Sequence, residues 1–123
     1  MHTQHITNAP IHERGGQSSY LLLSEGQFGS KHLAITWVDC PPRSSQPLHQ
    51  HDTQEQIYVI TQGRGVMTVG EEGRELEAGT LIFIPPATPH TIRNDTDAPM
   101  SYVSATSPPF DGATVGALYR AQT

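Results

Sequence analysis

Apolar residues along this chain gather in short runs that glycine and proline interrupt, and no helical period stands out before residue 112. Runs rich in Ile, Val, Tyr and Trp favour strands, because β-branched and aromatic side chains pack well on a pleated sheet. They predict strands at residues 20–23, 32–38, 56–62, 66–69, 74–77, 80–84, 90–93 and 100–105. Turn signals separate these runs at intervals of about ten residues, a spacing typical of an antiparallel sandwich or barrel.

The length of 123 residues fits a single domain. We expect a flexible N-terminal arm at residues 1–17, a β-barrel domain at residues 18–110 and a C-terminal tail at residues 111–123. Within the tail, residues 112–121 either form one short turn of helix or stay irregular.

The charge of the chain argues against two classes of partner. Seven Lys and Arg residues face twelve Asp and Glu residues, for a net charge of −5, and no basic cluster is present. Binding to nucleic acid or to an anionic membrane is therefore not expected. One cysteine, Cys40, rules out an internal disulfide, and Met1 to Pro10 lack the apolar core of a signal peptide. A cytoplasmic protein is expected.

Four histidines lie beyond residue 17, and three of them suggest a metal site. His49 and His51 are two residues apart, a spacing that places both side chains on one face of a strand. His90 opens a later predicted strand, and Glu55 or Gln56 can add an oxygen ligand. Three nitrogen ligands and one oxygen leave coordination positions open for substrate, as in catalytic metal sites.

Two segments around these histidines resemble the two motifs of the cupin superfamily. Residues 43–63 read RSSQPLHQHDTQEQIYVITQG and resemble the first motif, which contains H-x-H, a glutamate and a closing glycine. Residues 79–94 read GTLIFIPPATPHTIRN and resemble the second motif, with Gly79, Pro85, His90 and Asn94 in place. The resemblance implies a small single-domain bacterial cupin, an all-β fold with one antiparallel β-barrel of the double-stranded jelly-roll type.

The chain departs from the family pattern at three positions. Arg43 replaces the first glycine and Ala87 replaces the turn glycine, so Ala87 is expected to avoid positive φ. Gln56 stands where the family has its glutamate, six residues before Gly63. This register favours Gln56 as the fourth ligand, with Tyr58 and Ile60 facing inward beside it. Its neighbour Glu55 remains the alternative, since adjacent strand residues point to opposite faces.

The ligand set implied by the resemblance is therefore His49, His51, Gln56 and His90, holding one divalent transition metal such as Zn, Ni, Fe or Mn. Four neutral ligands leave the metal its full charge, which favours Lewis-acid chemistry and attracts anionic substrates. The set is similar to that of small bacterial cupins that open the rings of unsaturated sugar acids. Binding should weaken below about pH 6, because imidazole must be neutral to coordinate a metal.

The expected function is that of a metal-dependent isomerase or lyase acting on a small oxygenated or sugar-acid substrate. A cupin dioxygenase using non-haem Fe(II) and a non-catalytic, small-molecule-binding cupin remain alternatives. Strand parity and motif position make Tyr58 and Tyr102 the candidate catalytic residues and place Phe83 in the lining of the pocket.

The apolar side chains of residues 20–23, Ile57 and Val59 would be partly exposed on a lone barrel. Exposed apolar surface commonly marks an interface, and closed two-fold dimers are the commonest assembly, so we expect a homodimer.

Overall fold

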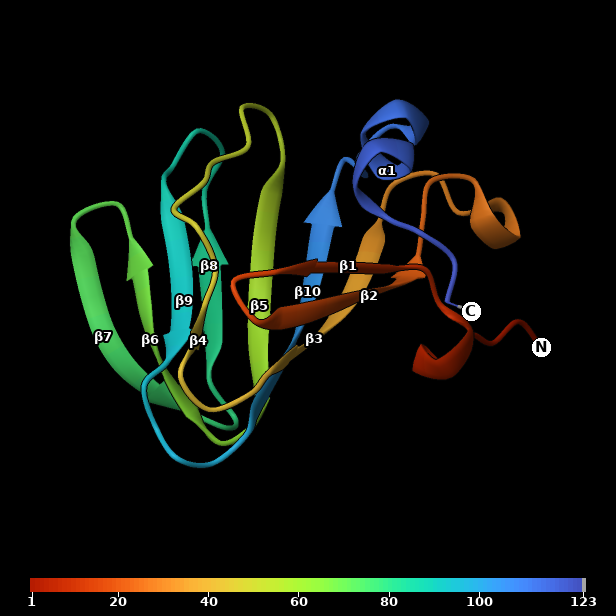
Figure 1. Ribbon diagram of the computed structural model, residues 1–123. Coiled ribbons are helices and arrows are strands. Elements are labelled where there is room, and N and C mark those ends of the chain that lie inside the picture. Colours follow the sequence, from red (N-terminus) through yellow and green to blue (C-terminus); the bar gives the residue numbers. More distant parts are fainter. Residues whose placement is uncertain (123) are drawn as a thin grey trace.

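The computed structural model describes residues 1–122, which form two facing antiparallel sheets (Figure 1). A six-stranded sheet has the order β1-β2-β3-β10-β5-β8, and a four-stranded sheet has the order β4-β9-β6-β7. The strands are β1 (Ile11–Arg14), β2 (Gln17–Leu23), β3 (Ala34–Cys40), β4 (Ser44–Ser45), β5 (Glu55–Gln62), β6 (Arg64–Val69), β7 (Glu72–Glu77), β8 (Leu81–Ile84), β9 (His90–Asn94) and β10 (Met100–Ser107). The helical elements are the 3-10 turns η1 (Ile6–Asn8) and η2 (Gln27–Gly29) and the helix α1 (Gly112–Leu118). The predicted all-β jelly-roll fold is confirmed.

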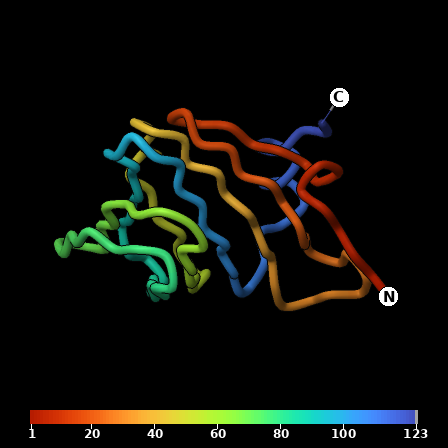
Figure 2. Tube along the Cα trace, turned by 90° about the horizontal axis from the view of Figure 1, so that it is seen from below, coloured from red at the N-terminus to blue at the C-terminus, as the bar shows by residue number. Residues whose placement is uncertain are grey.

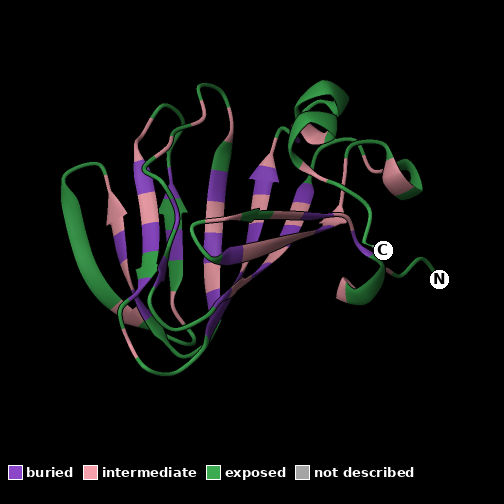
Figure 3. Cartoon of the chain, viewed as in Figure 1, coloured by how far each residue is buried: buried purple, intermediate pink, exposed green. Residues whose placement is uncertain are grey.

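The core fills the space between the two sheets. Inward side chains alternate with outward ones along β3, β5 and β10, which Figure 3 shows as alternating bands of burial. Tyr58 is 3% exposed and Ile60 is 1% exposed, so both face inward as the register predicted. β7 lies at the edge of its sheet and is exposed along most of its length.

The outer face of the six-stranded sheet is apolar across five strands. Cross-strand pairing aligns two rows of side chains on this face, none of which is fully buried. The rows are Tyr20, Trp37, Val103, Val59 and Leu81, and Leu23, Ile35, Ala105, Ile57 and Phe83. The expected partial exposure at residues 20–23, Ile57 and Val59 is present, except that Leu21 is buried.

Two short strands were missed by the hydrophobic pattern, β1 and β4. β1 pairs with β2 through a turn at Gly15 and Gly16, both at positive φ, as a two-residue hairpin turn requires. A Cβ atom on Gly15 would lie 1.6 Å from the carbonyl oxygen of Ser45, and the amide of Ser45 donates to the carbonyl of Gly15 at 3.0 Å. The glycine thus lets the hairpin dock on β4, in the opposite sheet.

The N-terminal segment and the C-terminal segment up to residue 122 lie on the same side of the molecule, beside β1 and β2 (Figures 1 and 2). The backbones of Ile11 and Arg120 exchange two hydrogen bonds, at 2.8 and 3.0 Å, and Arg120 forms an ion pair with Glu13. The hydroxyls of Tyr119 and Ser19 are 2.7 Å apart. The flexibility expected for residues 1–17 and the proposed division into arm, barrel and tail remain predictions. No helix in residues 1–122 has the length and apolar character needed to cross a membrane.

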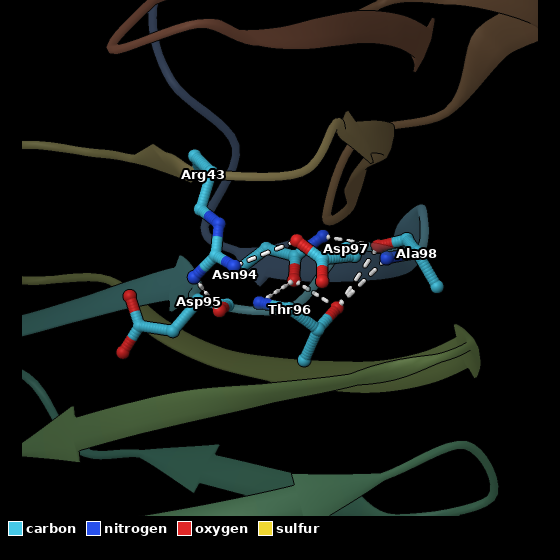
Figure 4. Close-up of polar contacts among 6 residues, drawn as sticks. All are labelled: Arg43, Asn94, Asp95, Thr96, Asp97 and Ala98. Carbon is cyan, nitrogen blue, oxygen red and sulfur yellow. Dashed lines mark hydrogen bonds and ion pairs between the residues drawn. The ribbon is translucent and has the colours of Figure 1, made fainter.

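Asn94 of the second motif has a structural role (Figure 4). This buried side chain donates to the carbonyls of Cys40 and Ala98 and accepts from the amide and hydroxyl of Thr96, so its hydrogen bonds shape the loop after β9. Arg43 reaches the same loop, where it donates to the carbonyl of Asp95 and pairs with Asp97 at 2.6 Å.

Candidate metal centre

The segment that carries His49 and His51 is not a regular strand, which corrects the predicted strand geometry. His49 forms a single bridge with His90, in which each amide donates to the other's carbonyl, at 3.1 and 2.8 Å. This bridge holds the first motif against the start of β9. The two histidine segments are therefore brought together by backbone hydrogen bonds.

The turn before β9 fixes the position of His51. The amide of Ala87 donates to the carbonyl of His51 at 2.7 Å. Ala87 has φ of 57°, so the expectation that it avoids positive φ is wrong. The hydrogen bond and the two flanking strands hold the turn in the left-handed conformation even though the residue has a Cβ atom, at a local cost of about 1–2 kcal/mol.

The three histidines offer ligand atoms that all lie within 4.8 Å of one another. The Nδ1 atom of His49 is 2.8 Å from the carbonyl of Pro47, and that of His90 is 2.9 Å from the carbonyl of Thr88. Because a carbonyl only accepts, each Nδ1 carries the proton, and each Nε2 is left with a lone pair that can accept a hydrogen bond or bind a metal. The Nε2 atom of His90 is buried and has no hydrogen-bond partner. This tautomer is the one that a metal-binding histidine needs.

Gln56 faces the same space. It is 6% exposed, and its Nε2 donates to the hydroxyl of Thr106 at 2.8 Å. Its Oε1 is buried without a hydrogen-bond partner, whereas the side chain of Glu55 is exposed on the other side of the strand. A buried acceptor left unpaired is costly. The orphaned oxygen of Gln56 and the orphaned nitrogen of His90 together fit a metal ion. The role of Gln56 as fourth ligand stays a prediction.

Burial keeps the imidazoles neutral. Desolvation, reinforced by the positive charges of neighbouring groups, lowers the pKa of His49 to about 4 and that of His51 to about 4. The pKa of His90 is lowered as well, again mainly by burial. An unperturbed imidazole implied that protons displace a metal below about pH 6. With the lowered pKa values, protons compete with a metal for these nitrogens only in more acid solution.

His49 and His51 border a cavity of ≈ 490 Å³, and the ligand atom of His90 lies within 4.8 Å of theirs. The lining of the cavity combines mostly neutral polar groups with side chains of the C-terminal segment, including Phe110, Val115, Leu118 and Tyr119. Tyr58 and Tyr102 both line the cavity as predicted, with their rings stacked at 4.4 Å. Phe83 does not: it is 51% exposed on the outer face, because its position on β8 has the opposite parity to the buried Ile82 and Ile84.

Arg14 is a cavity residue that the sequence did not reveal as functional. Its guanidinium Nη2 lies 3.4 Å from Nε2 of His49, and it lines the same cavity. The sequence feature that could have located Arg14 is the Gly15-Gly16 pair, since two glycines between short extended runs are typical of a hairpin. That hairpin would have placed Arg14 at a turn beside the barrel, although not at the histidines.

Comparisons with known proteins agree with the geometry. A sequence model described as the cupin domain matches residues 36–106. An uncharacterised protein of Methanocaldococcus jannaschii is 43% identical over 70 residues, which are 57% of this chain and 56% of that protein, so the chain spans just over half the length of this relative. An oxalate-binding protein of Thermotoga maritima is 28% identical over 83 residues, or 68% of this chain and 69% of the relative.

Among solved structures, a predicted oxalate decarboxylase from Thermotoga maritima superposes with a TM-score of 0.77 and 23% identity. The match covers 87% of this chain and 98% of the other. At this identity, the likeness establishes the shared fold.

Proposed function

The chain belongs to the cupin domain family, and we propose that it is a metal-dependent isomerase or lyase acting on a small oxygenated or sugar-acid substrate. His49, His51, Gln56 and His90 would hold one divalent transition metal, of the group Zn, Ni, Fe or Mn. The observation that carries the proposal is the convergence of three imidazoles, two of which border a cavity of ≈ 490 Å³, together with the buried Oε1 of Gln56 and Nε2 of His90, which lack any partner.

When bound, a divalent metal would supply a Lewis acid that polarises a substrate oxygen. The ligands proposed for it are all neutral, so none would reduce its charge. This favours non-redox chemistry over the dioxygenase alternative.

Tyr58 and Tyr102 are the proposed catalytic residues, and their environment limits what they can do. Burial raises the pKa of Tyr58 to about 12 and that of Tyr102 well above its usual value. Both phenols stay protonated at neutral pH. Their role is therefore to donate hydrogen bonds to substrate oxygens rather than to act as bases.

A second candidate is a non-catalytic protein that binds a small acid. The Thermotoga maritima relative is an oxalate-binding protein, which favours this alternative. The two candidates share the metal and the cavity, and turnover separates them.

We further propose that the protein is a cytoplasmic homodimer. The apolar outer face of the six-stranded sheet, with Leu81 and Phe83 more than half exposed, supports the dimer. A second copy of the same face would cover these side chains.

The first test is metal content. Purified wild-type protein, loaded with Zn, Ni, Fe or Mn and dialysed, should retain about one ion per chain by elemental analysis, as a single mononuclear site requires. The double variant His49→Ala/His51→Ala should fold and retain none, while the matched control His32→Ala, on an exposed residue outside the cavity, should behave as wild type.

Metal-loaded protein would then be incubated with unsaturated and saturated sugar acids, and product followed by proton NMR. Full metal retention by the double variant would place the site elsewhere. Metal binding without turnover of any sugar acid would favour the binding protein over the enzyme.

A further inference from the structure

Arg14 differs from the other arginines in what it contacts. Each of the other five in the described chain pairs with a carboxylate: Arg43 with Asp97, Arg64 with Glu75, Arg74 with Glu72, Arg93 with Asp95 and Arg120 with Glu13. Among residues 1–122, no carboxylate forms an ion pair with Arg14. Its recorded side-chain contact is with Nε2 of His49, at 3.4 Å, an atom that the metal would take. Metal binding would thus leave the guanidinium without an acceptor.

The charge of the cavity points to an anion as the missing acceptor. Among the residues that line it, Arg14 and Asp52 are the charged ones, and Asp52 is exposed at the rim. The proposed metal ligands are neutral. A divalent ion therefore adds to the positive charge of Arg14 in a partly buried space, and a negative ligand beside both would offset their repulsion.

Gln46 adds a second unsatisfied group on the same cavity. It is 7% exposed, and its Nε2 donates to the hydroxyl of Tyr102 at 3.1 Å and to Oε1 of Gln17 at 3.4 Å. Its own Oε1 is buried without a partner. An amide oxygen accepts hydrogen bonds, so the complementary group on a ligand is a hydroxyl.

We propose that Arg14 binds the carboxylate of the substrate and that Gln46 accepts a hydrogen bond from one of its hydroxyls, so that the ligand is a hydroxy acid of sugar size. A guanidinium presents parallel N–H donors that match a carboxylate. The cavity volume of ≈ 490 Å³ lies in the range of sites for ligands much larger than a two-carbon acid. This inference rests on the proposed function, whose site it shares.

The fold holds Arg14 in place for this task. Arg14 is the last residue of β1, directly before the glycine that docks on β4. The backbone hydrogen bonds between Ile11 and Arg120 anchor the same strand on its other side. The backbone at Arg14 is therefore held by two contacts distant in sequence, which reduces the backbone freedom that would be lost on binding an anion.

The test is calorimetric titration of the full chain at pH 7.5 with Ni²⁺ alone, and then with D-galacturonate or its neutral counterpart D-galactose, on both metal-free and Ni²⁺-loaded protein. In Arg14→Gln, Ni²⁺ should bind about tenfold more tightly, because a nearby positive charge is gone. Galacturonate should bind roughly ten- to hundredfold more weakly to the same variant. Arg14→Lys should keep the wild-type Ni²⁺ affinity and lose part of the galacturonate affinity.

Two further variants act as controls. Arg120→Gln removes a cation that pairs with Glu13 of β1 and does not line the cavity, and it should change neither titration. Gln46→Leu should weaken galacturonate and galactose alike, as loss of a hydroxyl contact requires. Opposite shifts in the affinities of Arg14→Gln for Ni²⁺ and for galacturonate support the proposal, since a merely structural role would weaken the binding of both.

Equal affinities of wild type and Arg14→Gln for galacturonate would overturn the proposal. A parallel loss of affinity for Ni²⁺ and for galacturonate would overturn it as well. If wild-type protein fails to bind Ni²⁺, the proposed function fails instead. The metal-free titration then still decides on Arg14: weaker galacturonate binding by Arg14→Gln supports the carboxylate contact, and no difference refutes it.

Discussion

The substitution Gln56→Glu tests the neutral ligand set at the position that departs from the cupin motif. It keeps the shape of the side chain and replaces the orphaned amide oxygen by a carboxylate. In metal-free protein the change is unfavourable, because it buries a charge at a position that is 6% exposed. Reorientation of the Thr106 hydroxyl, now 2.8 Å from Nε2 of Gln56, offsets part of that cost. We expect the metal-free variant to be less stable than wild type by about 1–3 kcal/mol.

With metal bound, the effect of Gln56→Glu becomes favourable. A unit charge about 4 Å from a divalent ion gains roughly 8 kcal/mol at an effective dielectric constant of about 20. Burial of the carboxylate costs several kcal/mol of this. A net gain of about 1–4 kcal/mol corresponds to metal binding that is roughly ten- to thousandfold tighter. A Lewis-acid reaction should slow, because the carboxylate lowers the effective charge on the metal.

The assay is competitive metal titration with a chromophoric chelator, together with urea unfolding of metal-free protein. Glu55→Gln is the matched control, since the side chain next to Gln56 points into solvent and should leave both quantities unchanged. Loss of metal in Glu55→Gln with no effect of Gln56→Glu would identify Glu55 as the ligand. The argument for a neutral, non-redox site would then fail.

Ala87→Gly should raise the free energy of unfolding by about 0.5–1 kcal/mol and the melting temperature by about 2–4 °C, because glycine tolerates positive φ; a calorimetric scan measures this. The metal-free protein should lose stability as the pH falls from 6.5 to about 4, because His49 and His51 then bind protons in the unfolded state and not in the folded one. After discounting for partial solvent screening, the free energy of unfolding measured with urea should fall by about 1–2 kcal/mol for each histidine. Equal stability at pH 7 and pH 4.5 would contradict this prediction. Light scattering should give twice the chain mass of 13.4 kDa for wild type and for the control Leu33→Lys, but the chain mass itself for Phe83→Lys.

The sequence predicted the barrel strands well and the N-terminal hairpin poorly, for physical reasons. Strands such as β5 are short runs of β-branched and aromatic residues that end at glycine or proline, so they are visible in the sequence. β1 has four residues of mixed character, and its place in the sheet depends on pairing with β2 and on contacts with Arg120, more than a hundred residues away. Arg14 could therefore not be linked to His49 from local pattern alone.

The departures from the cupin motifs separate into two physical kinds. Arg43 and Ala87 stand at glycine positions and still adopt φ of 61° and 57°. A backbone hydrogen bond to His51 holds Ala87 in this conformation, and the guanidinium of Arg43 binds the loop after β9. Such changes alter stability and leave the geometry of the site intact.

Gln56 is a departure of the other kind. Its backbone register and inward direction are those expected of the family's glutamate, so the exchange alters only the charge presented to the histidines. If Gln56 holds the metal as proposed, chemistry that distinguishes this protein from cupins with a carboxylate ligand should follow from that one charge together with Arg14, which has no carboxylate partner among residues 1–122.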